Sequence, residues 1–416
     1  MSVAERFLRY VQIDTQSDPN SDTTPSTEKQ KDLSRLLLQE LQAIGIADAV
    51  MDEYGYVFGT LPATLPPDVA ARTPVVALLA HVDTAPDESG TNVKPIVHKN
   101  YDGSLLRLPG DPSVTLDPVR QPALLRHIGQ DLITSDGTTL LGSDDKAGVA
   151  VLMQLAEDLV HDDTPRPTIR LCFTVDEEIG RGVDKLELAT LGADIAYTLD
   201  GSDIDTISVE TFNAAAAKLR VEGVMVHPGY AKDVMVNAVR ILAEMMAALP
   251  SHEAPETTED RAGYFHPHTI TAGDATSVEA QLILRDFTDE GMQRRKDYLH
   301  ALVTLFQARY PKAKITLDVK DQYKNMRTYI EEKDARAASF AYKAAEAMGI
   351  TLEEHLVRGG TDGSRLSERG LPTPNIFNGG HDYHSRFEWN TVQNLEHTLA
   401  YTKTLVRYWG EHGWEG

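Results

Sequence analysis

The sequence has almost no cysteine and no long apolar segment. Its single cysteine, Cys172, excludes an internal disulfide, and such low cysteine usage is typical of a reducing cytoplasm. No apolar run approaches the roughly 20 residues that a membrane-spanning helix needs. The first residues, MSVAERFLRYVQIDTQ, place charged side chains among the apolar ones, so no secretory signal peptide is expected. A cytoplasmic location is predicted.

Basic residues are also in short supply. The 416 residues include 63 acidic and 40 basic side chains, which gives a formal net charge of −23. Nucleic acids and anionic membranes both favour clustered lysine and arginine, so neither is predicted as a partner. A composition of 41% hydrophobic and 25% charged residues is typical of a soluble globular protein, and the length favours two domains.

Several common catalytic motifs are missing from the sequence. There is no HExxH pattern, which excludes a thermolysin-like single-zinc site. There is no Walker-type glycine-rich loop, and the GxSxG pattern of serine hydrolases is absent.

The first half of the chain alternates short apolar runs with helical patterns. PVVALLAHVD, TIRLCFTV and ADIAYTLDG are typical of strands buried on both faces, and Cys172 is predicted to be a buried strand thiol. Helices are predicted over 27–44, where Thr27 and Gln30 have capping-box spacing, and over 146–160. This alternation predicts an α/β domain with a mixed, largely parallel sheet flanked by helices.

A different pattern begins near Asn213. Strand and helix patterns follow in the order β-α-β-β-α-β, which is that of a ferredoxin-like unit. Its first helix is predicted over 232–249, with one apolar side formed by Met235, Val239, Leu242 and Met246. We expect residues 1–210 and 326–416 to form the α/β domain, with 211–325 inserted as a second domain.

Acidic and histidine side chains follow several of these apolar runs. They are His81, Asp83, Glu177, Glu178 and Asp200, together with Asp144 in GSDDKAG and the histidines of GGHDYHSRFE. The carboxyl ends of parallel strands share one edge of a sheet, where functional groups gather. Each motif alone also suits an ordinary strand end or helix N-terminus, but together they favour a site for Zn²⁺, Mn²⁺ or Co²⁺.

Seven blocks of sequence together resemble the peptidase T family of two-zinc exopeptidases, a group that also includes peptidase V and the aminoacylases. They span residues 81–380 and read HVDTAPDESG, TLLGSDDKAG, FTVDEEIGRG, YTLDG, VHPGYAKDVMVNA, LRDF and RGGTDGSRLSERGLPTPNIFNGG. The resemblance implies a zinc-exopeptidase-like catalytic domain and an inserted domain that serves as a lid and in dimerisation.

The resemblance also implies a metal-binding role for five residues. His81 and Asp200 would hold one ion, Glu178 and His384 the other, and Asp144 would bridge both. The expected cofactor is two Zn²⁺ per subunit, with Co²⁺ or Mn²⁺ as possible substitutes. His381, three residues before His384, is the alternative ligand in that segment.

Catalytic and substrate-binding roles are implied in the same way. Glu177 would be the general base, and Asp83 would orient His81. Of the other acids beside these residues, Asp176 is expected to be a strand-end or loop acid and Asp145 a helix cap. The resemblance further implies that His227, Arg285 and Arg358 bind substrate, with Arg285 suited to a carboxylate.

The expected activity is release of the N-terminal residue from tripeptides by a homodimeric enzyme. The alternatives are a related dipeptidase, carboxypeptidase or aminoacylase, which would share the metal ligands and hold the substrate ends differently. A metal-binding protein without catalysis is a further alternative.

Overall fold

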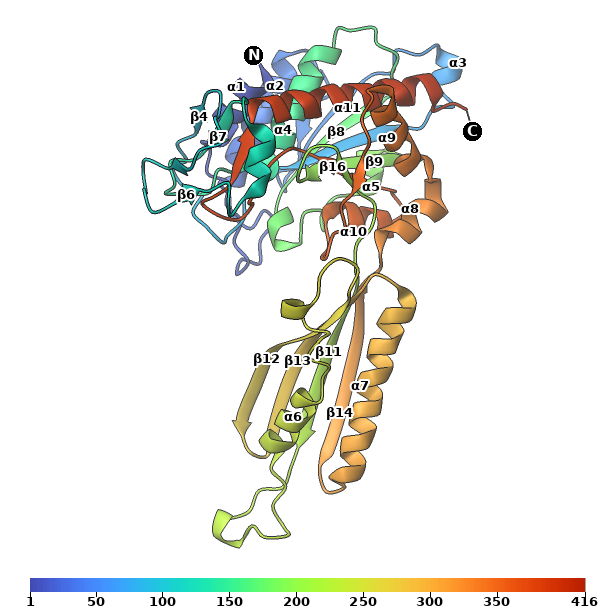
Figure 1. Ribbon diagram of the computed structural model, residues 1–416. Coiled ribbons are helices and arrows are strands. Elements are labelled where there is room, and N and C mark those ends of the chain that lie inside the picture. Colours follow the sequence, from blue (N-terminus) through green and yellow to red (C-terminus); the bar gives the residue numbers. More distant parts are fainter. Residues whose placement is uncertain (416) are drawn as a thin grey trace. The chain divides into compact units, whose positions relative to one another are not determined.

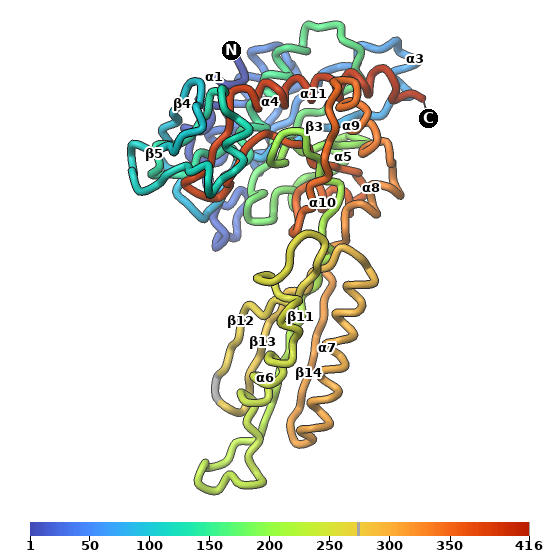
Figure 2. The backbone as a smooth tube through the Cα atoms, in the orientation of Figure 1, coloured from blue at the N-terminus to red at the C-terminus, as the bar shows by residue number. Residues whose placement is uncertain are grey.

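The computed structural model describes residues 1–415, with the side chains of residues 273 and 274 left out. The chain forms two compact units. The first comprises Met1–Val209, Tyr329–His355 and the chain from Thr361 onward, and the second comprises Glu210–Thr328 and Leu356–Gly360. Figure 2 shows this path by colour: the chain enters the second unit in green, leaves it in orange and returns to the first.

The first unit is built on an eight-stranded mixed sheet (Figure 1). In sheet order its strands are β1 (Val50–Met51), β2 (Val57–Leu61), β8 (Ile169–Thr174), β3 (Val76–His81), β9 (Ile195–Gly201), β16 (Asn375–Phe377), β10 (Thr206–Ser208) and β15 (Glu353–Glu354). At the centre, β3 pairs with β8 and β9 in parallel, and β16 pairs in parallel with β9. Every residue of β3 is buried, as its unbroken apolar run predicts.

Helices flank this sheet. They are α1 (Val3–Tyr10), α2 (Gln30–Ala43), α3 (Pro67–Ala70), α4 (Ser143–Leu159), α5 (Leu188–Leu191), α8 (Met326–Asp334), α9 (Arg336–Ala347), α10 (Asp362–Glu368) and α11 (Val392–His412). Helix α4 packs on β3 and β9 and contacts α1 and α11, while α10 packs against β9. Figure 1 shows α4 and α11 on one side of the sheet and α10 on the other. The predicted mixed, largely parallel sheet flanked by helices is confirmed.

Smaller elements complete the first unit. An antiparallel three-stranded sheet has the order β17 (Trp389–Thr391), β7 (Leu132–Thr134), β4 (Ile96–His98), and β5 (Leu106–Arg107) pairs with β6 (Thr115–Leu116). The short 3₁₀ helices of the chain are η1 (Pro122–His127), η2 (Glu177–Ile179), η3 (Pro228–Tyr230) and η4 (Pro255–Thr257). Within residues 1–415, no helix combines the length and apolarity needed to cross a bilayer.

The second unit has the predicted order β-α-β-β-α-β. Its elements are β11 (Asn213–Glu222), α6 (Ala238–Ala247), β12 (Tyr264–Asp274), β13 (Ser277–Asp286), α7 (Asp289–Arg309) and β14 (Lys314–Tyr323). The sheet is antiparallel with the order β12-β13-β11-β14. In β13 the buried residues alternate strictly with half-buried ones, because one face of the sheet packs against α6 and α7.

Two local predictions are wrong. Thr27 and Gln30 form no capping box: Thr27 Oγ1 donates to the carbonyl of Gln16, and α2 begins at Gln30 without a side-chain cap. The helix predicted over 232–249 begins later, because the Asn237 side chain accepts from the N–H of Arg240 and caps α6 there. Its buried face therefore contains Ala238, Ile241, Leu242 and Met245.

Candidate active site

His81 is the last residue of the buried central strand β3, and its ring is 2% exposed. The backbone carbonyl of Asp83 lies 3.1 Å from Nδ1 and accepts a hydrogen bond when that nitrogen is protonated. The other nitrogen, Nε2, then faces carboxylates, 3.1 Å from Asp144 Oδ1 and 3.5 Å from Asp200 Oδ1. One ring nitrogen is therefore oriented by the backbone while the other meets carboxylates, as is usual for a metal-binding histidine.

Asp144 lies between two histidines. Its Oδ1 is 3.1 Å from His81 Nε2, and its Oδ2 is 3.3 Å from His384 Nε2. The residue belongs to the first turn of α4, where its own backbone is not helical. Because its two oxygens face different histidines, the carboxylate is placed to contact two cations at once.

Glu178 and His384 form the other side of the cluster. Glu178 Oε2 lies 2.8 Å from His384 Nε2, and the glutamate side chain is 3% exposed. His384 has a φ of 57°, in the left-handed region, and its ring is 43% exposed. The structure thus brings His384 to Asp144 and Glu178, whereas the alternative ligand His381 contacts neither of them among the described residues.

Glu177 is the first residue of η2 and lies three residues after the end of the strand β8. It joins His81 and Asp200 in a group whose ligand atoms all lie within 4.8 Å of one another, and His81, Asp144 and Glu178 form a second such group. The neighbouring side chains of Glu177 and Glu178 therefore belong to different groups, although both groups share His81.

Asp83 holds the backbone of Glu177 and Glu178 in place. Its carboxylate is fully buried and accepts the backbone N–H groups of Glu177 at 3.0 Å and Glu178 at 3.2 Å. Its Oδ1 also lies 3.4 Å from His81 Nδ1. One carboxylate thereby fixes the backbone of both glutamates relative to the end of β3.

The protonation of these groups reflects crowded, buried negative charge. Burial, and then the charge of Asp144, raises the pKa of Glu178 to about 8 and that of Asp200 to about 6. Burial and the nearby Asp200 and Asp362 also raise the pKa of Glu177 well above its ordinary value. Hydrogen bonds to Asp144 and Glu178 raise the pKa of His384 to about 11. Without another cation, the cluster is relieved only by holding protons.

The residues present fit divalent metal ions. Glu178 Oε1 is buried and has no hydrogen-bond partner among the described residues, although an unpaired buried oxygen is costly. Imidazole and carboxylate donors are the ligands that zinc and its neighbours prefer. A cation would satisfy the unpaired oxygen and relieve the crowded carboxylates together.

Sequence reasoning missed two acids that support the site. Glu388 is buried and accepts the N–H groups of Leu141, Gly142 and Asp144 at 2.7–3.0 Å, which fixes the turn that carries Asp144. Asp362 is buried, and its N–H donates to Glu177 Oε1 at 3.3 Å. Both lie in blocks of sequence noted above, but no spacing rule distinguishes them from ordinary loop acids.

Asp145 has the helix-capping contact that was predicted. Its Oδ1 accepts the N–H of Gly148 at 3.1 Å, and Asn378 also donates to it. Its Oδ2 accepts the backbone N–H of His81 at 3.2 Å, so the side chain also anchors the end of β3.

Asp176, the first acid of the run of three, points away from this set. It is fully buried and bonds to Ser26 and Gln30. Cys172 is a buried strand thiol, as predicted.

The three predicted substrate-binding residues belong to the second unit. His227 is exposed and accepts the N–H of Gly229 through Nδ1 at 3.2 Å, capping η3. Arg285 contacts Gln322 and lies over the ring of Tyr323. Arg358 donates to the backbone carbonyls of Thr258, Asp260 and Ala262, so its guanidinium already has partners within that unit.

Comparison with known proteins gives consistent matches. Residues 209–314 match the family model described as a peptidase dimerisation domain, and residues 134–245 match one described as M42 glutamyl aminopeptidase. The chain is 44% identical over 394 residues to peptidase T of Geobacillus sp. (strain WCH70), an alignment that covers 94% of this chain and 95% of that protein.

Solved structures share the fold. The aminopeptidase PepT from Bacillus cereus ATCC 10987 aligns with a TM-score of 0.75 at 21% identity, covering 98% of both chains. A tripeptidase from Staphylococcus aureus aligns with a TM-score of 0.73 at 23% identity, again covering 98% of both. With near-complete coverage at 44% identity to a sequence relative and the same fold, the chain belongs to the peptidase T family of metallopeptidases.

Proposed function

We propose that this chain is a cytoplasmic, metal-dependent aminopeptidase that releases the N-terminal residue from tripeptides. The observation that carries the proposal is the position of Asp144, whose two oxygens face His81 and His384 separately at 3.1 and 3.3 Å. A carboxylate so placed suits a pair of cations, which in hydrolases lie about 3.5–4 Å apart.

Two Zn²⁺ ions are the proposed cofactor, with Co²⁺ or Mn²⁺ as substitutes. His81 and Asp200 would hold one ion, Glu178 and His384 the other, and Asp144 both. Bound there, the ions would acidify a water molecule and polarise the carbonyl of the scissile peptide bond.

Glu177 is the proposed general base. Its side chain is grouped with His81 and Asp200 but is not needed to complete either proposed ligand set. It would take a proton from the attacking water and deliver it to the leaving amine.

Asp83 is proposed to orient rather than to react. By accepting hydrogen bonds from the backbone N–H groups of Glu177 and Glu178, it would keep the general base and one metal ligand in fixed positions relative to each other. Its contacts with His81 Nδ1 would leave Nε2 available to a metal ion.

The second unit is proposed to bind substrate and to form a homodimer. The match of residues 209–314 to a peptidase dimerisation domain supports the dimer. His227 is proposed to contact the scissile carbonyl, and Arg285 a substrate carboxylate. Arg358 is also predicted to bind substrate through a contact like that of Arg285.

A peptide panel tests the activity. The metal-loaded protein is expected to cleave a tripeptide at its first peptide bond and to lose this activity when the amino terminus is acetylated. Preferential cleavage of the acetylated peptide, of dipeptides or of C-terminal residues would instead favour a related aminoacylase, dipeptidase or carboxypeptidase. No cleavage of any peptide by protein that carries metal would refute the proposal.

A further inference from the structure

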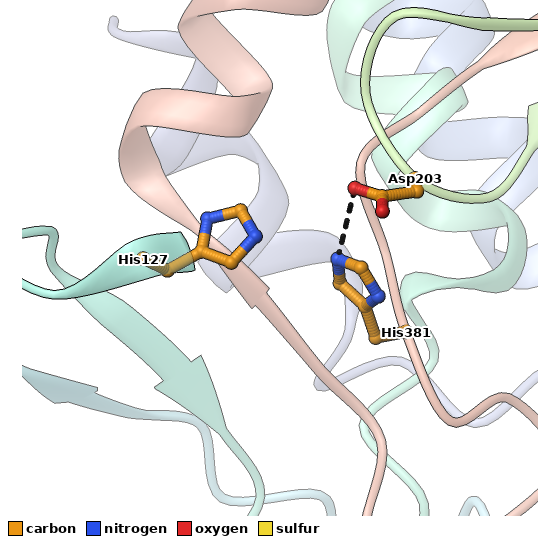
Figure 3. Close-up of side chains that lie close together, drawn as sticks. All are labelled: His127, Asp203 and His381. Carbon is orange, nitrogen blue, oxygen red and sulfur yellow. Dashed lines mark ion pairs between the residues drawn. The ribbon is translucent and has the colours of Figure 1, made fainter. Parts of the chain in front are cut away.

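Away from the Asp144 cluster, two histidines and an aspartate converge from three separate segments of the first unit. His127 ends η1, Asp203 lies between β9 and β10, and His381 precedes β17. Their ligand atoms all lie within 4.8 Å of one another. Figure 3 shows the two imidazoles and the carboxylate facing a common space, where His381 Nε2 and Asp203 Oδ1 lie 3.5 Å apart.

Neighbouring hydrogen bonds fix which nitrogen of His127 faces this space. The hydroxyl of Thr391 donates to Gln130 Oε1 at 2.7 Å, and His127 Nδ1 lies 3.0 Å from the same oxygen. Since that oxygen can only accept, Nδ1 carries the proton and Nε2 bears a lone pair. His127 Nε2 is buried and has no hydrogen-bond partner among the described residues. An imidazole with one N–H bonded to a carbonyl oxygen and the other nitrogen free is the arrangement typical of metal ligands.

The ring of His381 is held in place by a different contact. Its ring stacks on Trp389 with centroids 4.0 Å apart and planes 13° apart. Its Nε2 lies 3.5 Å from Asp203 Oδ1 but makes no hydrogen bond within residues 1–415. Burial lowers the pKa of His127 and lowers that of His381 to about 4, so both rings are neutral near pH 7.

Asp203 can supply the third ligand while keeping its other contact. Arg126 pairs with Oδ2, which leaves Oδ1 toward His381. A cavity of about 320 Å³ adjoins the group and is lined by Arg126, His127, Gln130 and Asp203, among other residues. It gives a cation and its remaining water ligands a route from solvent.

We propose that His127, Asp203 and His381 form a separate binding site for one divalent cation of the zinc type. Two neutral imidazoles and one carboxylate are a common protein ligand set for Zn²⁺, with water completing the coordination. Ligand atoms within 4.8 Å of one another must draw closer to reach bonding distances of about 2.0–2.2 Å from one ion.

The position of this site suits a structural role for the cation. Asp203 lies three residues after Asp200, and His381 three residues before His384. A cation held here would tie together the segments that carry these two proposed ligands and the segment that ends η1. This role depends on the proposed function, whereas the existence of the site does not.

Two substitutions test the site without disturbing the proposed catalytic residues. His381→Phe keeps an aromatic ring against Trp389 and removes the nitrogen. Asp203→Asn changes a side chain that is 22% exposed. The matched control is His98→Gln, because His98 is a half-buried histidine whose Nε2 already has a partner in Thr134.

Each protein is equilibrated by dialysis against buffered micromolar Zn²⁺, and bound zinc per chain is measured by mass spectrometry. Wild type and His98→Gln are expected to bind one more zinc per chain than His381→Phe and Asp203→Asn. Equal zinc in all four proteins would overturn the proposal. If His381→Phe does not fold, as judged by circular dichroism, the comparison of Asp203→Asn with wild type decides.

The same samples separate this inference from the proposed function. Tripeptide cleavage is measured alongside the zinc content. If the two variants lack one zinc and still cleave the tripeptide, the result supports the new site. If all four proteins cleave it and bind equal zinc, the result refutes this site and leaves the proposed function standing. If the wild-type protein does not cleave the tripeptide but binds one zinc more than the two variants, the result would refute the function and support the site.

Discussion

Replacing Asp176 with alanine is expected to destabilise the first unit without removing metal. The Asp176 carboxylate is fully buried and accepts the N–H of Ser26 at 2.7 Å, the Ser26 hydroxyl at 2.5 Å and the Gln30 amide at 2.7 Å. Gln30 Oε1 in turn accepts the N–H of Asp176 at 3.1 Å. These bonds join the start of α2 to the end of β8.

The magnitude follows from the donors that would be left without partners. In Asp176→Ala the N–H and the hydroxyl of Ser26 would lose their acceptor, at about 1–3 kcal/mol each, with the lower figure where water enters the space. The Gln30 amide would keep weaker acceptors in Ser26 Oγ and Thr27 Oγ1. Asp176 also has a φ of 59°, where alanine costs roughly 1–2 kcal/mol. We therefore expect the free energy of unfolding to fall by about 3–8 kcal/mol. Asp176→Asn should lose about half of this, since asparagine keeps one acceptor oxygen and tolerates positive φ.

Tryptophan fluorescence during urea unfolding measures this change. All three tryptophans, Trp389, Trp409 and Trp414, belong to the first unit, so the signal reports on that unit. Metal content of the folded protein at low temperature is measured in parallel and should match wild type. A change below about 1 kcal/mol in Asp176→Ala would refute the hydrogen-bond reasoning. Loss of metal from a well-folded variant would show that Asp176 acts in the metal site.

Four further predictions concern other acids and one histidine. Glu177→Gln should lower kcat at least about 100-fold, because a general base contributes 10²–10⁴-fold, while bound metal is unchanged; steady-state kinetics with normal rates would contradict it. Glu178→Ala should lower bound metal by about one ion per chain, measured by mass spectrometry, since its carboxylate is a proposed ligand. Glu388→Ala should lower the free energy of unfolding by about 3 kcal/mol or more, because three backbone N–H groups lose their acceptor; an unchanged urea midpoint would refute this. The pKa of His381 is lowered to about 4 in the folded protein, whereas a histidine in the unfolded chain has a pKa of about 6.5. As pH falls below about 6.5, His381 therefore becomes protonated in the unfolded chain before it does in the folded protein, which favours unfolding. In metal-free protein His381 alone should therefore contribute a loss of up to about 3 kcal/mol between pH 6.5 and 4, measured as the difference between wild type and His381→Phe in urea unfolding.

Much of the fold could be predicted from periodicity alone. The unbroken apolar run before His81 predicts a strand buried on both faces, and the alternation in residues 277–286 predicts one buried face; the structure has both. Helix boundaries were less accurate. The start of α6 depends on the Asn237 side chain capping the N–H of Arg240, and the apolar pattern of residues 232–249 carries no signal for that choice.

The sequence by itself determined the chemistry available at the candidate active site. His81, Glu177, Glu178 and Asp200 each follow a strand run, and the common edge of a parallel sheet brings such residues together. Which acid meets which partner could not be deduced, because adjacent residues at a strand end point in different directions that depend on the local turn.

Only the tertiary structure separated side chains that look equivalent in the sequence. Asp176 points to Gln30 while Glu178 points to His384, and Glu388 holds the turn of Asp144 across 244 residues of chain. His381 faces His127, more than 250 residues away in the sequence. Such partners are set by how distant loops pack at the sheet edge, and a local pattern of residues carries no information about that packing.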